Sequence, residues 1–290
     1  MVEISASMVM VLRKKSGQGM MDCKKALEEA NGDVEQAMDI LRKKGLATLA
    51  KRADRETSEG TVVCWESADG KMAGLAVLRC ETDFVVKSDD FSQMVEAVRK
   101  GVQKCEVNEN GEKLLETTID GRKLNDILTE VVSKTGEKIQ LIKDEYKRYC
   151  LDGPGLISTY IHFNGKVGTM VQIETSDEAI AAADALKQTA ADIAMHITAT
   201  KPLALDKDGI SAETIEKEKA IFAEQVKNKP ANIIDKIVEG KMKKFFVENC
   251  LVEQRFVKDD SKTVAQVLAE AAKEAGGEAK IKRFVRFEVG

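Results

Sequence analysis

Three carboxylates stand close together in the chain, at Asp83, Asp89 and Asp90. Carboxylate oxygens are ligands that Mg²⁺ prefers, so this group could serve a magnesium-dependent phosphohydrolase. A helix that begins after Ser88 explains Asp89 and Asp90 without catalysis, because acids in a first turn are stabilised by the helix dipole. The sequence also shows no evident Lys or Arg cradle for a phosphate. We therefore expect that the chain is not an enzyme, and keep the hydrolase as an alternative.

Histidine and cysteine offer little further chemistry. The chain holds 6 cysteines, none of them spaced as Cys-x-x-Cys, and its 2 histidines, His162 and His196, are far apart. This pattern argues against structural zinc and favours reduced, buried thiols. His196 stands on a predicted helix without a nucleophile motif, so a hydrogen-bonded, half-buried side chain explains it better than a catalytic base. We expect no metal and no cofactor.

Phe84 is the residue that most needs an explanation. It follows Asp83 in a short connection between an apolar strand, Met72 to Leu78, and the helix from Asp89. Such connections usually lie on the surface, where a large aromatic side chain lowers solubility. Two interpretations are open. Either Phe84 folds back over the sheet while Asp83 caps a neighbour, or the ring is presented to a partner.

The composition is that of an ordinary globular chain, with 43% hydrophobic and 32% charged residues. A length of 290 residues suggests two or three domains. A net charge of -4 without a basic block makes gripping nucleic acid a poor main function. No apolar run approaches the ~20 residues of a membrane span, and no signal peptide precedes the first helix. We expect a cytoplasmic chain that contacts neither membrane nor nucleic acid directly.

Residues 1 to 45 predict three short helices with apolar faces at helical spacing. Ser5 or Ser7 caps the first helix, and Gly45 ends the third. Met20 and Met21 open the second helix, either as core side chains or as an adaptable contact surface. Residues 46 to 59 are polar and predict a helical extension and a linker.

The middle of the chain shows the same plan twice. Two predicted strands, Thr61 to Glu66 and Met72 to Cys80, flank the hairpin signal Asp69-Gly70, and two later strands flank Asn164-Gly165. Both pairs run on into a helix, so that Glu81-Thr82 matches Glu174-Thr175. The pattern predicts an α+β fold with a duplicated core of small antiparallel sheets covered by helices.

The rest of the chain completes the second copy. One Ala-rich helix is expected from Asp177 to Thr198 with Ser176 as its cap, followed by a helical hairpin broken at Lys229-Pro230. A last helix over Thr263 to Lys273 precedes a strand whose alternation puts Ile281, Val285, Phe287 and Val289 on one side. The predicted domains are residues 1–54, 55–140, 141–205, 206–250 and 251–290.

Five short motifs follow one another along nearly the whole chain: Gly19 to Leu27, Thr82 to Val85, Ile193 to Ile197 with Lys201-Pro202 after it, Glu239 to Phe245, and Arg283 to Val289. Together they resemble signatures of the elongation factor Ts family. The resemblance implies that the N-terminal unit is ubiquitin-associated-like. It also implies that the helical hairpin is an inserted coiled coil, and leaves open a homodimer through that hairpin.

The resemblance implies a guanine-nucleotide exchange factor that binds elongation factor Tu, GDP-bound or nucleotide-free, and promotes GDP release without covalent chemistry. Phe84 would be a wedge that disturbs the partner's Mg²⁺ and phosphate site, supported by Thr82, Asp83 and Val85. Further partner contacts would come from Leu12, Met20, Met21 and His196. The alternative is a protein-interaction scaffold that acts through its N-terminal three-helix unit.

Overall fold

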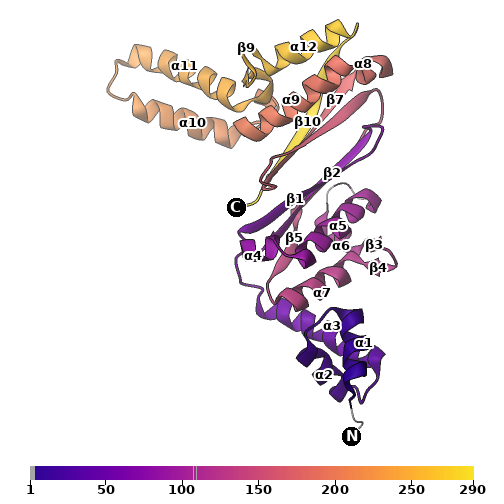
Figure 1. The fold of residues 1–290 in the computed structure, drawn as a ribbon. Coiled ribbons are helices and arrows are strands. Elements are labelled where there is room, and N and C mark those ends of the chain that lie inside the picture. Colours follow the sequence, from indigo (N-terminus) through magenta and orange to yellow (C-terminus); the bar gives the residue numbers. More distant parts are fainter. Residues whose placement is uncertain (1–3, 107, 109) are drawn as a thin grey trace.

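The computed structural model of the chain describes residues 4–106, 108 and 110–290 (Figure 1). Two three-stranded antiparallel sheets stack in the middle of the molecule, with helices on their outer faces. A small helical unit lies at the N-terminal end, and a long helical hairpin projects from the other end. This arrangement confirms the predicted α+β class.

The N-terminal unit consists of α1 (Ala6–Ser16), α2 (Met20–Glu29) and the start of α3 (Val34–Lys51). The Ser5 hydroxyl accepts a hydrogen bond from the Met8 amide and so caps α1. Gly17, at φ 66°, ends that helix in a left-handed conformation that glycine adopts without strain. The three helices enclose a small core of their own.

The third helix was predicted to end at Gly45, but it continues without a break to Lys51. It packs against α7 (Leu124–Thr135) of the first core half. A Cβ atom at Gly45 would lie 2.8 Å from the carbonyl oxygen of Thr129. The glycine is therefore explained by the close approach of two helices rather than by helix termination.

The first core half contains β1 (Glu59–Glu66), β2 (Met72–Cys80) and β5 (Ile139–Cys150), in the order β1-β2-β5. The predicted domain boundary at residue 140 falls inside β5. This strand belongs to the first core half, because it pairs with β2. Helix α5 (Asp89–Lys104) covers the sheet together with α7, and buries Phe91 as core. Between them lie elements too short for a periodicity to predict: α6 (Gly111–Glu116), β3 (Thr118–Ile119) and β4 (Arg122–Lys123).

The second half repeats this plan with β6 (Gly155–Ile161), β7 (Val167–Thr175) and β10 (Ala279–Glu288), in the order β10-β7-β6. Its covering helices are α9 (Asp184–Thr200) and α12 (Val264–Glu274). The single helix predicted from Asp177 is wrong, because α8 (Glu178–Ala182) ends before α9 begins. Asp177, not Ser176, caps α8 through bonds from two backbone amides.

Strand β10 carries an irregularity that the alternation in the sequence does not reveal. Its register shifts between Ile281 and Arg283. Ile281 therefore packs among the helices of the second half, whereas Val285, Phe287 and Val289 face the first sheet. The prediction that all four side chains share one side is wrong, since one extra residue in a strand moves the following side chains to the opposite face.

The two halves exchange hydrogen bonds in a reciprocal pattern. The Val62 amide donates to Gly165 O (2.8 Å), and the Ile157 amide donates to Gly70 O (3.0 Å). Each hairpin turn thus binds the first strand of the other half. The two donors, Val62 and Ile157, are separated by the same number of residues as the two acceptors, Gly70 and Gly165, so this spacing relates equivalent positions of the two copies. The same spacing matches Thr82 with Asp177, which corrects the predicted match of Glu81-Thr82 with Glu174-Thr175.

The projecting hairpin is formed by α10 (Ala212–Gln225) and α11 (Ala231–Asn249), as predicted. Val226 and Met242 are buried along it, and Lys241 Nζ lies 5.4 Å from the centre of the Phe222 ring. A short hairpin of β8 (Arg255–Phe256) and β9 (Asp259–Thr263) then leads into α12. None of the helices in the described part of the chain has the length and apolar character that a membrane span requires.

Candidate functional site

The connection after β2 forms a one-turn helix, α4 (Asp83–Val86), at one end of the sheets. The Thr82 hydroxyl caps it by accepting a hydrogen bond from the Val85 amide (3.4 Å). The Val85 side chain is buried in the core of the first half, whereas Phe84 is 80% exposed. The interpretation in which Phe84 folds back over the sheet is therefore wrong. The ring points into solvent from a turn that is anchored on its other side.

Asp83 shares the exposed side of this turn. Its carboxylate accepts a hydrogen bond from Lys87 Nζ at 2.7 Å, which lowers the pKa of Asp83. Asp90, by contrast, lies 3.6 Å from Lys134. The two acids thus pair with different lysines instead of converging on one cation. Within the described residues, no group of three or more His, Cys, Asp or Glu side chains is arranged to hold a metal ion.

A residue that the sequence did not reveal, Glu137, holds the start of the turn. The Thr82 hydroxyl donates to Glu137 Oε1 (2.9 Å), and the Thr82 amide donates to Glu137 Oε2 (3.1 Å). Glu137 stands two residues before the start of β5, the strand beside β2. The signal in the sequence is an acid just before the segment from Ile139, whose alternating residues are typical of a strand, and using it requires knowing that this segment pairs with β2.

Cys80, at the end of β2, is a structural thiol. It is fully buried, and its Sγ lies 3.2 Å from Thr82 O. Burial, together with the nearby Glu137 carboxylate, raises the pKa of Cys80 to about 12. A thiol with such a pKa is not a nucleophile near neutral pH.

The N-terminal unit presents a second apolar surface. Met20 and Met21 are both exposed, whereas Leu12 is completely buried in the core of the unit. The expectation that the Leu12 side chain contacts a partner is therefore wrong, because Leu12 lies on the face of α1 that packs against the other two helices of the unit and is not accessible. Met20 and Met21 remain available.

The N-terminal unit is fixed against the first half. Gln18 donates from Nε2 to Glu130 O (3.5 Å) and accepts at Oε1 from the Ser133 hydroxyl (3.3 Å). An ion pair joins Arg42 to Asp126 on α7. Met20 and Met21 are thus held in a defined position relative to α4.

His196, predicted from the sequence to be half-buried and hydrogen-bonded and implied by the resemblance to contact a partner, is completely buried. Its Nε2 lies 3.0 Å from Gln254 Oε1, and its Nδ1 accepts a hydrogen bond from the Val257 amide (3.2 Å). An acceptor at Nδ1 requires the neutral ring with its proton on Nε2. Burial lowers the pKa of His196. The side chain joins α9 to the β8–β9 hairpin and cannot itself contact a partner.

The exposed aromatic of the second half is Phe163, which the sequence analysis did not single out. Phe163 is 92% exposed at the tip of the β6–β7 hairpin, with its ring centre 4.4 Å from that of His162. The following Lys166 pairs with Glu59 at the start of β1 (2.6 Å). Because β1 also contacts α4, Phe163 and Phe84 lie at the same end of the stacked sheets. The sequence signal that could have revealed this exposed ring is an aromatic residue just before the turn Asn164-Gly165.

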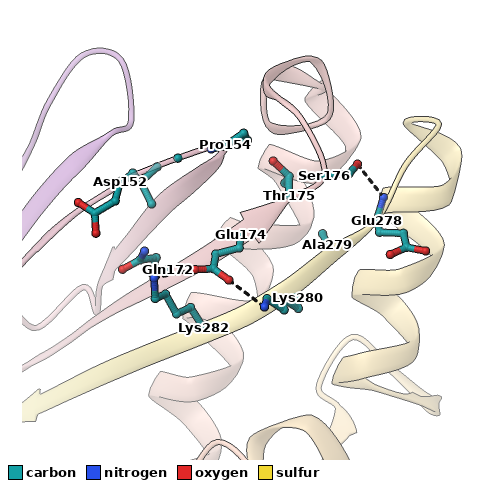
Figure 2. Close-up of a pocket in the computed structure, with 12 residues that line it drawn as sticks. Asp152, Pro154, Gln172, Glu174, Thr175, Ser176, Glu278, Ala279, Lys280 and Lys282 are labelled. Carbon is teal, nitrogen blue, oxygen red and sulfur yellow. Dashed lines mark hydrogen bonds and ion pairs between the residues drawn. The ribbon is translucent and has the colours of Figure 1, made fainter.

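A hollow of about 520 Å³ lies elsewhere, on the second sheet (Figure 2). Its central acid, Glu174, lies 2.7 Å from Lys282 and 3.1 Å from Lys280. The two lysines of this hollow are therefore paired with an acid of the same hollow.

Exposed apolar side chains on rigid supports lie at α2, α4 and the β6–β7 hairpin, an arrangement typical of surfaces that contact another protein. A family model described as "Elongation factor TS" matches residues 81–290. Curated relatives named "Elongation factor Ts" match nearly the whole chain. That of Nitratiruptor sp. is 47% identical over 99% of this chain and 93% of its own length. That of Nautilia profundicola is 44% identical over 100% and 94%. The chain belongs to the elongation factor Ts family, and its role lies in translation elongation.

Proposed function

We propose that the chain is a guanine-nucleotide exchange factor for elongation factor Tu, and that Phe84 is the wedge that releases GDP. The observation that carries this proposal is an aromatic side chain, 80% exposed, on a turn whose opposite side is anchored in the core. The second copy of the fold has Ala179 at the matching position of α8. The fold itself therefore does not require an aromatic there, which supports a role in binding.

The mechanism needs no bond to be made or broken. A GTPase holds its nucleotide through a phosphate loop, a lysine and Mg²⁺. Because Mg²⁺ demands near-ideal octahedral geometry, a small displacement of the groups that support it weakens its hold. Phe84 enters between partner helices and causes that displacement, while Asp83 accepts hydrogen bonds that fix the approach. By linkage, the factor and GDP weaken each other's binding by the same factor, and GTP can then rebind.

Two further surfaces hold the wedge in register. Met20 and Met21 contribute flexible apolar side chains that adapt to a partner surface. Phe163 replaces His196 as the contact from the second half, because it is the exposed side chain. Several linked contacts on one rigid body raise the affinity beyond that of any one of them. Such a factor works where elongation takes place, in the cytoplasm.

The test is release of a fluorescent GDP analogue from purified elongation factor Tu, chased with excess GDP, with and without this protein. A large acceleration that saturates with protein concentration is the expected result. If the folded chain binds elongation factor Tu without speeding release, the proposed exchange activity is wrong and the scaffold alternative takes its place. Removing residues 1 to 45 distinguishes the two, because a scaffold would lose binding altogether, whereas an exchange factor would lose affinity but keep some acceleration.

A further inference from the structure

The turn that carries Phe84 is too short to hold its own shape. Helix α4 has 4 residues, and isolated helices of that length are unstable in water. The Glu137 carboxylate accepts from both the amide and the hydroxyl of Thr82, which leads directly into the turn. Hydrogen bonds to an ionised acceptor are the stronger kind. One carboxylate from a neighbouring strand thus fixes where the turn begins.

A second acid ties the same place to the N-terminal unit. Glu81 Oε1 accepts from the Lys138 amide (2.7 Å) and from Arg52 Nη1 (2.7 Å). Lys138 Nζ in turn donates to Ala53 O (2.7 Å) in the segment after α3. Two adjacent pairs of residues, at the end of β2 and at the start of β5, therefore join the Phe84 turn to the segment that follows the N-terminal unit.

The second copy of the fold supplies an internal comparison. Cys80 pairs with Ile139, and the matching Thr175 pairs with Ala279, so Gly277 occupies the position of Glu137. Asp177 there caps α8 with its own carboxylate, which accepts from two backbone amides. The structural connection is also retained, because the Glu278 amide donates to Ser176 Oγ (3.2 Å) as the Lys138 amide donates to Glu81. The fold can thus form this corner without a carboxylate at the Glu137 position.

We propose that Glu137 is a positioning residue for exchange, which holds Thr82 so that Phe84 points in one direction. The acid and the aromatic occur together in the first copy, and glycine and alanine stand in their places in the second. This inference rests on the proposed function, since the direction of Phe84 matters only if the ring is the wedge. Without Glu137 the core stays folded, but the turn moves and the ring meets the partner in fewer productive orientations.

The test compares Glu137→Ala with Glu278→Ala, a matched removal of an acid at the adjacent position of the second copy. Because the ring then meets the partner in fewer productive orientations, we expect Glu137→Ala to lower the maximum rate of GDP release roughly fivefold, which corresponds to about 1 kcal/mol, the cost of ordering one contact side chain on binding. Glu137→Gln, which keeps one acceptor oxygen, should recover part of the loss. Glu278→Ala should leave exchange unchanged. Thermal unfolding of each variant establishes that the fold is intact.

A spectroscopic readout separates this proposal from the proposed function. The 9 phenylalanines are replaced by 4-fluorophenylalanine, and Phe84→Leu assigns the resonance of residue 84. In free Glu137→Ala that fluorine resonance should shift and narrow as the ring becomes more mobile, while the Glu278→Ala spectrum stays unchanged. An unaltered resonance in a folded Glu137→Ala protein would overturn the positioning role. Failure of the unmodified protein to release GDP would overturn the proposed function instead, whatever the resonance shows.

Discussion

Truncating Phe84 to alanine should abolish most of the exchange activity and leave the fold unaffected. The ring is 80% exposed in the free chain, so folding buries little of it. Surface substitutions of this kind change the free energy of unfolding by about 0.5 kcal/mol or less. In the complex the same ring becomes buried, and full burial of a phenylalanine side chain is worth about 1.5–3 kcal/mol. Since 1.4 kcal/mol corresponds to a factor of ten, kcat/KM for GDP release should fall roughly ten- to a hundredfold.

The assay is stopped-flow GDP release over a range of factor concentrations. A wedge acts in the step that expels the nucleotide, so the maximum rate should fall, and not only the apparent affinity. Ile221→Ala is a suitable control, because Ile221 is also an exposed large apolar side chain but lies on α10, in the helical hairpin that projects from the far end of the molecule. It should leave both quantities unchanged. If folded Phe84→Ala releases GDP within twofold of the unmodified protein, the wedge mechanism is refuted.

Three further predictions concern affinity, pH and thiol chemistry. The double change Met20→Ala and Met21→Ala should raise the half-saturating factor concentration several-fold with little effect on the maximum rate, in the same stopped-flow assay; a fall in the maximum rate alone would contradict a pure contact role. Because His196 is neutral in the fold and its pKa is lowered from 6.5, the unfolded chain takes up a proton first as the pH falls below that value, so urea titrations should show stability decreasing toward pH ~5. His196→Gln should remove this His-dependent part of the slope, and an unchanged slope would assign the effect to other groups. Cys80, with its pKa raised to about 12, should resist alkylation at pH ~8 until the protein unfolds, as followed by peptide mass spectrometry; rapid labelling of the folded protein would contradict its burial.

Local signals in the sequence were sufficient for the elements that depend on neighbouring residues. The hairpins at Asp69-Gly70 and Asn164-Gly165 formed as predicted, because those residues adopt a turn whatever packs around them. The serine caps at Ser5 and Ser88 are likewise set within one helical turn. Gly45 was misread for the opposite reason: its role is set by helix α7, which is distant in sequence.

The residues of the candidate site likewise differ in whether neighbouring or distant residues determine their role. The place of Phe84 between a buried strand and a capped helix predicted a surface connection but left open whether the ring folds back, and only the family resemblance implied that it is exposed. For His196, the sequence predicted a half-buried, hydrogen-bonded side chain. Its complete burial could not be predicted, since its partners Gln254 and Val257 lie far along the chain and reach it only through the β8–β9 hairpin. Glu137 escaped notice because its role depends on the pairing of β5 with β2. Contacts between distant segments therefore decided which polar residues matter.

The duplication also sets the two ends of the stacked sheets against each other as an internal comparison. Reciprocal packing places α4 beside the second hairpin turn, and α8 beside the first, where Lys71 pairs with Glu178. The two ends are thus built alike from one element of each copy. One end carries Phe84 and Phe163, whereas the matching positions at the other end are Ala179 and Ala68.

The backbone is repeated in the two copies but the exposed aromatics are not, so the fold does not explain why they are present. A partner that binds only one end of the stacked sheets would explain them. If Phe84 is the wedge, Phe163 lies on the same approach and should contribute to the same encounter. Phe163→Ala should then weaken binding of elongation factor Tu while leaving the maximum rate of release nearly intact, because the ring anchors the complex without entering the nucleotide domain.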